Sequence, residues 1–329
     1  MSVGEAGAAS AAGEARRAKS TILIGTSGYS FPDWVGPFYP PGTDRARMLD
    51  FYVKEFPVVE VNATYYRIPP PSTLHAMERK TPPGFEFVVK AHHDMTHERS
   101  LDPDLYRAFA RALEPLRMEG KLHGVLAQFP YAFRRTRENE AFLLELRRRV
   151  AADTPLFVEF RHNSWIAEDL FSWLESEGLG YVSVDEPDLP GLVSPVARVT
   201  GEVGYVRFHG RNKENWWGPE SRASGRPDGS RGRKRPGTTE APTEYGPLFA
   251  MAGEDGAAAT AGAAAAAANS SDRYDYLYSE SELREWVDKI REMTLKAKKT
   301  FVFFNNCHVG QAASGAKLMR KLLEGEGLL

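Results

Sequence analysis

Residues 156–165 read LFVEFRHNSW, and an apolar run passes there into charged residues with no turn residue between them. The run LFVEF is typical of a buried β-strand. Glu159 and Arg161 are two residues apart, so they face the same side of such a strand, whereas His162 turns to the other side. We therefore expect the carboxyl end of this strand to carry a polar site.

Seven further apolar runs share the chain with this one: ILIGTS (22–27), VVEVNA (58–63), FEFVVKA (85–91), GVLAQFP (124–130), GYVSVD (180–185), VGYVRFHG (203–210) and TFVFFNN (300–306). Segments with a period near 3.6 lie between most of them, at 45–56, 104–118, 138–150, 168–177, 281–293 and 311–323. Parallel strands need crossover helices. The pattern therefore predicts an α/β protein with a TIM-type (β/α)8 barrel. The GTSG motif after the first run lacks the glycine spacing of a dinucleotide-binding loop.

Two segments fall outside this pattern. Residues 1–20 are rich in Ala, Gly and Ser and lack an apolar core, so they predict a disordered tail rather than a signal peptide. Residues 219–272 are rich in Gly, Ala, Ser, Pro and Arg without hydrophobic periodicity, and they predict a disordered insertion after the seventh strand. We therefore expect a single barrel domain over 21–325, interrupted by this insertion.

The composition limits the classes of partner and compartment. The chain has 329 residues, with 42 Lys and Arg against 44 Asp and Glu, so its formal net charge of −2 does not indicate a polyanion as partner. A single cysteine excludes an internal disulfide and fits a reducing compartment. No apolar run is long enough to span a bilayer. We expect a cytoplasmic protein with no membrane partner.

Polar residues gather where the predicted strands end. In a parallel barrel this face carries the active site. The residues are Thr26 and Ser27; Glu60 and Asn62; Lys90, His92 and His93; Gln128; Glu159 and Arg161; Asp185; Arg207, His209 and Arg211; and Asn305 and Asn306. A buried charge costs several kcal/mol, in the range of about 3–5, when its partner is missing. Such a ring therefore predicts a functional site, with a structural ion-pair network as the alternative.

The ordered motifs IGTSGYSFPDW, VEVNATYYRIP, VVKAHHDMTH, LAQFP, VEFRHNSW, YVRFHGR, YDYLYSESEL and FFNN resemble those of the YecE-like family, a domain of unknown function (number 72). The resemblance covers about residues 20–210 and 273–325 and implies a TIM-type barrel without an established reaction. The family's polar motifs fall here on Glu60, Asn62, Lys90, Thr96, His97, Gln128, Glu159, Arg161, His162, Arg207, His209, Arg211, Asn305 and Asn306. The chain departs from the family in its insertion and at Gly315, where an asparagine is expected.

These residues predict acid/base chemistry, hydrolysis or isomerisation, on a small anionic substrate such as a sugar phosphate. Arginine and lysine bind phosphate or carboxylate, and this role falls to Lys90, Arg161, Arg207 and Arg211. Glu60 and Glu159 are the candidate general acid and base, and His209 a candidate for proton transfer. The amides that would orient the substrate are Asn62, Gln128, Asn305 and Asn306. No cofactor is expected.

Two other classes stay open. One is a metal-dependent phosphodiesterase that acts on nucleic acid. The ligands of its divalent ion would be Glu60, His92, Glu159, Asp185 and His209. The basic stretch SRGRKRPG at 230–237 would then contact phosphates, although a solvated loop is the favoured interpretation. The third class is a non-catalytic protein that binds an anionic ligand.

Two single residues suggest covalent catalysis. Cys307 adjoins His308, but neighbours on a strand face opposite sides, so a small buried thiol is favoured over a nucleophile. Lys90 would form a Schiff base if desolvated. With arginines nearby, anion binding is the favoured role.

Overall fold

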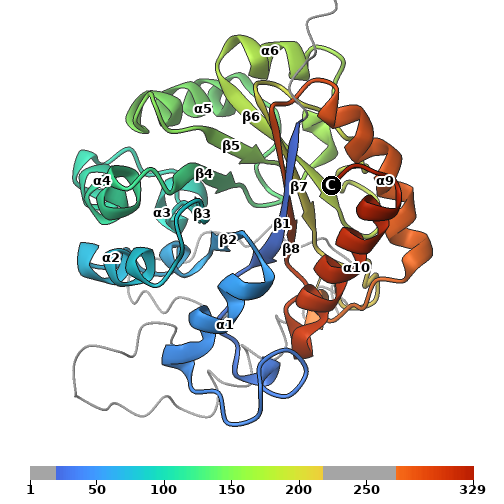
Figure 1. The fold of residues 1–329 in the computed structure, drawn as a ribbon. Helices are drawn as coiled ribbons and strands as arrows, with labels where there is room; N and C mark the ends of the chain where they lie inside the picture. The colour runs from blue at the N-terminus through green and yellow to red at the C-terminus, as the bar shows by residue number, and fades with distance from the viewer. Residues whose placement is uncertain (1–19, 218–271) are drawn as a thin grey trace, which may run out of the picture.

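The computed structural model describes residues 20–217 and 272–329. Its strands form a closed parallel barrel in which each strand pairs with its neighbours in sequence and the last pairs with the first (Figure 1). They are β1 (Thr21–Ser27), β2 (Val58–Val61), β3 (Glu86–Lys90), β4 (Leu122–Gln128), β5 (Leu156–Glu159), β6 (Leu179–Asp185), β7 (Val203–Phe208) and β8 (Lys299–Phe304). The predicted (β/α)8 barrel is confirmed. Apart from Ser20 and Asp272, the predicted tail and insertion lie outside the described residues.

Helices surround the barrel: α1 (Met48–Glu55), α2 (Pro71–Arg79), α3 (His93–Thr96), α4 (Pro103–Met118), α5 (Arg137–Arg149), α6 (Leu170–Ser176), α9 (Glu280–Thr294) and α10 (Gln311–Gly325). Short 3-10 turns lie at Pro32–Trp34, Arg45–Arg47, Ala63–Tyr65, Asn163–Trp165, Asp272–Tyr274 and His308–Gly310. The six predicted helices agree with these bounds to within three residues. Between β6 and β7 the chain crosses as a loop, residues 186–202, with no helix in that described stretch.

Local sequence explains where individual helices begin. The Ser279 side chain accepts from the backbone N–H of Glu282, and the Glu282 carboxylate accepts from the backbone of Ser279, so α9 starts with a capping box. Asp102 caps α4 in a similar way, and Pro103 occupies its first position. These caps satisfy N–H groups that a helix leaves unpaired at its amino end.

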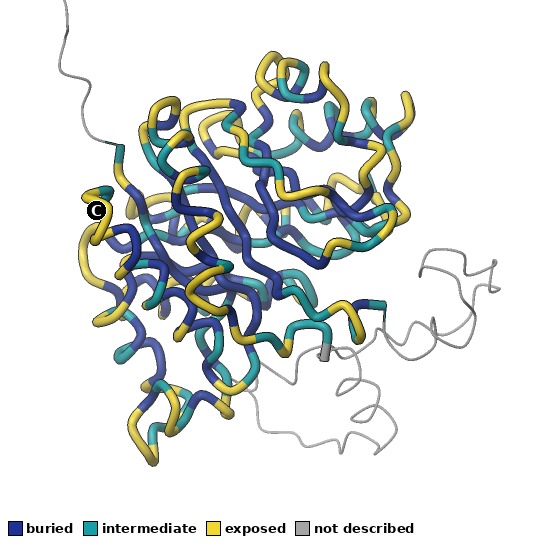
Figure 2. Tube along the Cα trace, turned by 90° about the vertical axis from the view of Figure 1, so that its right-hand side faces the viewer, coloured by how far each residue is buried: buried dark blue, intermediate teal, exposed yellow. Residues whose placement is uncertain are grey.

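Contacts across the barrel show which side chains face inward, because strands that are not neighbours can meet only through the interior. Near the amino ends of the strands, Lys299 on β8 pairs with Glu86 on β3 at 2.5 Å. Above this pair lies an aromatic layer, in which the Tyr205 ring is 4.8 Å from Phe157 and 5.9 Å from Phe301. Figure 2 shows that buried residues run along the strands and line the inner faces of the helices. The carboxyl ends carry charged layers instead.

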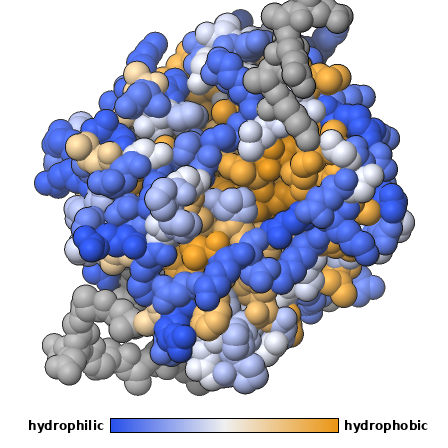
Figure 3. Space-filling model, viewed as in Figure 1, coloured by the Kyte–Doolittle hydropathy of each residue, from blue (hydrophilic) through white to orange (hydrophobic). Residues whose placement is uncertain are grey.

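The face of the molecule shown in Figure 3 is largely hydrophilic toward its edges, with apolar residues gathered in the middle. In the described part of the chain, none of the helices combines the length and the apolar character needed to cross a membrane.

Candidate active site

One guanidinium joins three strands at the top of the barrel interior. Arg207 on β7 donates from Nη1 to Glu159 Oε2 on β5 at 2.5 Å, and from Nη2 to Glu60 Oε1 on β2 at 2.7 Å. Tyr205 donates its hydroxyl to the other Glu60 oxygen at 2.6 Å. Glu60 and Glu159 are 0% exposed and Arg207 is 1% exposed. The sequence prediction that these residues converge is confirmed, but Glu60 and Arg207 bond to each other and expose almost no surface to a ligand.

A second polar layer is built around Glu159. Its Oε1 lies 2.7 Å from Arg161 Nε and 3.1 Å from His209 Nε2. Burial by itself raises the pKa of the Glu159 carboxyl, but Arg207, Arg161 and His209 outweigh burial and hold that pKa well below its usual range. Glu159 is therefore a carboxylate at neutral pH, and its main effect is to compensate the two guanidinium groups.

His209 is a neutral imidazole. Burial, followed by the nearby Arg161, lowers the pKa of His209 to about 3. Its Nδ1 lies 3.1 Å from Asn305 Nδ2, which fits an acceptor at Nδ1, and its Nε2 lies 3.1 Å from Glu159 Oε1 and 3.2 Å from Arg161 Nη2. A group with so low a pKa is a weak base near neutral pH, so His209 orients Glu159 and Asn305 rather than accepting protons.

Glu186 is a member of the cluster that the sequence prediction missed. It follows β6 directly, and its Oε2 accepts from Arg161 Nη1 at 3.1 Å while its Oε1 accepts from the backbone N–H of Val193. Burial raises the pKa of Glu186 to about 8; Arg161 acts against this and Glu159 reinforces it. Its carboxyl group therefore carries a proton near neutral pH. A strict two-residue alternation along 180–186 would have selected Glu186 rather than Asp185 as the inward residue.

Lys90, at the end of β3, is the partly exposed cation of this region. Its Nζ donates to Gln128 Oε1 at 2.7 Å and lies 4.3 Å from the centre of the Tyr65 ring. Burial, followed by Arg207, lowers the pKa of Lys90 to about 8. Next to this region, the amide oxygens of Asn62 and Asn305 are buried without a hydrogen-bond partner among the described residues. They are unused acceptors at the rim of the barrel.

Comparison with known proteins identifies the family. The family model described as "Protein of unknown function DUF72" matches residues 23–328 of this chain. The chain belongs to the DUF72 family. It is 32% identical to the UPF0759 protein YunF of Bacillus subtilis (strain 168) over 317 residues, which cover 93% of this chain and 95% of that relative.

Two solved DUF72 structures resemble this one. The crystal structure from Thermotoga maritima is 35% identical, has a TM-score of 0.71, and the match covers 92% of this chain and 99% of the other. The structure from Enterococcus faecalis is 25% identical with a TM-score of 0.69, and covers 92% and 96%. These comparisons support the barrel over nearly the whole DUF72 chain and name no reaction.

Two residues predicted for the mouth, Asp185 and Arg211, point elsewhere. Asp185 is the last residue of β6 and faces the helices, where it accepts hydrogen bonds from Tyr278, Trp286 and Arg211. Arg211 is bound by Asp185 and Glu285 because Gly210, at a φ of 90°, ends the alternation of β7 after His209. The prediction that Arg211 belongs to the ring at the barrel mouth with Arg207 is therefore wrong.

Asn306 and His162 also lie outside the cluster. Asn306 donates to the backbone carbonyl of Tyr276, on the side opposite to Asn305. His162 turns away from the mouth as predicted, and its Nδ1 accepts from the backbone N–H of Ser164 at the start of a 3-10 turn. The motif residue His97 lies beside Thr96, whose Oγ1 is 3.0 Å from His97 Nδ1.

The predicted set of metal ligands is not assembled. Asp185 faces outward, and His92 caps α3 by accepting from the backbone N–H of Asp94. Within 20–217 and 272–329, the one group of ligand atoms close enough for a metal is His92, His93 and Asp94. That group uses His92 Nδ1 for the cap, and it shares none of the barrel carboxylates. The basic stretch 230–237 lies outside the described residues.

Cys307 is buried, and its Sγ is 3.4 Å from the carbonyl oxygens of Ser27 and Asn305. Burial raises the pKa of the Cys307 thiol far above its usual value. This confirms the expected buried thiol and does not favour a nucleophile.

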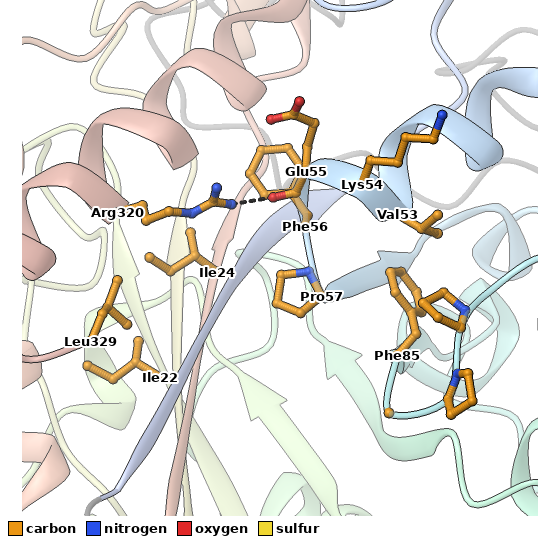
Figure 4. A pocket seen from close by; sticks show the side chains of 13 residues that line it. Ile22, Ile24, Val53, Lys54, Glu55, Phe56, Pro57, Phe85, Arg320 and Leu329 are labelled. Atoms are coloured by element: carbon orange, nitrogen blue, oxygen red, sulfur yellow. Dashed lines mark hydrogen bonds between the residues drawn. The ribbon is translucent and has the colours of Figure 1, made fainter.

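A groove of about 420 Å³ lies at the opposite end of the barrel, between α1, α10 and the start of β3 (Figure 4). Its lining is mainly apolar and includes Ile22, Ile24, Phe56, Pro57 and Phe85. Arg320 crosses one side and bonds to the Glu55 carbonyl. Its charged lining residues, Lys54, Glu55 and Arg320, are exposed or half-buried and do not form a buried cluster like the one at the barrel mouth, so this groove is not the candidate active site.

Proposed function

We propose that this DUF72 protein is an enzyme that binds a small phosphate- or carboxylate-bearing molecule at the barrel mouth and moves a proton on it. The proposal depends mainly on the charge of the cluster. Lys90, Arg161 and Arg207 supply three positive charges, and Glu60 and Glu159 supply two negative ones. Glu186 is protonated near neutral pH and His209 is neutral. One positive charge is therefore left uncompensated in a mostly buried site, and an anion would compensate it.

Arg161 is the group best placed to hold that anion. Its guanidinium lies above Glu159 and beside Glu186, and 5.7 Å from the centre of the Trp216 ring. Arginine forks match the geometry of phosphate and carboxylate. Lys90 is the second cation, and the unused amide oxygens of Asn62 and Asn305 suit hydroxyl or amide donors on the same ligand.

The proton-transfer role moves from the residues first predicted to Lys90 and Glu186. Efficient general acids and bases have pKa values near the working pH. The pKa values of Lys90 and Glu186 are each about 8, whereas that of His209 is about 3 and that of Glu159 is far below its usual range. Glu60, Glu159 and His209 therefore serve as positioning residues for Arg207 and Arg161.

Anion binding tests the proposal directly. Inorganic phosphate and small sugar phosphates or carboxylates are titrated into the protein by calorimetry at low salt. Arg161→Gln should weaken binding by about tenfold or more, because a charge-assisted hydrogen bond contributes about 1.5–3 kcal/mol. Arg211→Gln is the matched control, since Arg211 is bound by Asp185 outside the cluster, and it should bind like the wild type. Equal losses in the two variants, or no anion binding by the wild type, would refute the proposal.

A further inference from the structure

Lys90, which is partly exposed, differs from Lys121, a buried lysine of the barrel. Lys121 is paired with Glu78 at 2.9 Å and also donates to Thr81, so its charge is compensated and its donors are satisfied. Lys90 has no carboxylate within 4.0 Å among residues 20–217 and 272–329, and its one hydrogen bond goes to the neutral amide of Gln128. A lysine placed solely for structure would gain from a carboxylate partner. This arrangement instead leaves the amine available for chemistry.

The surroundings of Lys90 enlarge the unprotonated fraction of its amine at neutral pH, although most of the amine stays protonated. Burial has the largest effect on the pKa of Lys90, and the Arg207 and Arg161 guanidinium groups also lower it, whereas Glu159 and Glu60 act in the opposite direction. The Tyr65 ring covers one side of Nζ. Nearby cations and loss of water are the two conditions that activate a lysine as a nucleophile. Gln128 accepts one hydrogen bond and so orients the amine at the mouth.

We propose that Lys90 forms an imine with the carbonyl carbon of a small 2-oxo acid or aldehyde acid whose carboxylate is held by Arg161. This inference rests on the proposed anion site and names its substrate class. The Lys90 amine lone pair attacks the carbonyl carbon, and the carbonyl oxygen takes a proton to give a carbinolamine. Loss of that oxygen as water forms the C=N bond. No oxidant or reductant is consumed.

The imine is a good electron acceptor, and this gives a chemical role to Glu186, which is bonded to Arg161. A protonated imine stabilises negative charge at the adjacent carbon, which is the step shared by isomerisation, decarboxylation and aldol cleavage of such acids. Glu186 carries a proton near neutral pH, and it is bonded to the Arg161 guanidinium that would hold the substrate. It is therefore suited to give or take the proton at that carbon.

Reductive trapping tests this inference on the full chain. The protein is incubated at pH 7 with glyoxylate and sodium cyanoborohydride, which converts an imine into carboxymethyl-lysine, and modified peptides are quantified over time by mass spectrometry. An amine with a pKa of about 8 is about 300-fold richer in its reactive form at pH 7 than one with the ordinary value of 10.5. Lys90 should therefore be modified at least tens of times faster than the exposed Lys298 in the same digest. Lys90→Arg should abolish that fast product, and Lys298→Arg should leave it unchanged.

Acetaldehyde serves as the uncharged probe of similar size. The preference for Lys90 over Lys298 should be several-fold larger with glyoxylate than with acetaldehyde, since only glyoxylate carries the anion. Modification of Lys90 no faster than Lys298, or equal preference with both probes, would overturn the inference. If calorimetry shows glyoxylate bound through Arg161 while Lys90 stays unmodified, the imine is refuted and the anion site stands. The wild-type measurement does not depend on whether the variants fold.

Discussion

Replacing Glu159 with glutamine tests how much of the barrel's stability depends on the buried charge network. Glu159 faces two guanidinium groups, Arg207 at 2.5 Å and Arg161 at 2.7 Å, and a histidine at 3.1 Å. Glutamine keeps the shape but removes the negative charge, and its NH₂ group must face a donor. Removing one partner from a buried ion pair costs about 3–5 kcal/mol. Because Glu159 is 0% exposed, solvent cannot replace the lost compensation.

The assay is urea unfolding at pH 7, followed by circular dichroism, with the free energy of unfolding taken from the transition midpoint and slope. Glu159→Gln should lose about 3–5 kcal/mol, a large part of the stability of an ordinary domain. Glu202→Gln is the matched control, because Glu202 pairs with Lys298 at the surface and should show an unchanged midpoint. Equal midpoints for the two variants would show that the cluster is hydrated and that the reasoning is wrong.

Three further predictions concern other residues of the fold. The pKa of Glu186 is raised to about 8 from the ordinary 4.5, so its contribution to stability is present below pH 4.5 and is lost as the pH rises toward 8. The free energy of unfolding of the wild type should therefore fall relative to that of Glu186→Gln over pH 5–8. A difference that stays constant with pH would contradict this. Gly315→Ala should lower the unfolding midpoint although alanine favours helices, because the added Cβ would lie 2.8 Å from the Phe304 ring. Gly325→Ala is the control, since the space around Gly325 is open, and it should not lower the midpoint. A Gly315→Ala variant that is more stable than the wild type would show that the Phe304 ring moves freely. Cys307 should react with a thiol reagent only after unfolding, and rapid labelling of the native protein would disprove its burial.

The barrel could be predicted because its signals are local and repeated. Each strand is a short apolar run, and each of the six predicted helices shows a period near 3.6, so local patterns located the elements to within three residues. The convergence of Glu60, Glu159 and Arg207 followed from the rule that parallel strands end on one face. The missing asparagine at 315 also has a physical reason, since Phe304 fills the space that a side chain would need.

The errors in the predicted site residues arose where the direction of a side chain depends on a single residue of the strand or turn before it. Asp185 and Glu186 are adjacent, and one residue of register decides which carboxyl faces the barrel. Gly210 changes the direction of the chain before Arg211, and its φ of 90° cannot be read from composition. The pKa values of Glu186 and His209 depend on burial and on charges brought from other strands, and no local pattern contains that information.

The bridge made by Arg207 has a consequence for how the molecule can be divided. Its two carboxylate partners come from opposite halves of the barrel, Glu60 from β2, 147 residues away, and Glu159 from β5, 48 residues away. An amino-terminal fragment ending after β4 would bury Glu60 without a counter-ion, and the complementary carboxyl-terminal fragment would hold Arg207 with only one of its two anions. Each half therefore lacks part of its charge compensation until the two associate, and the charges are balanced only in the closed ring.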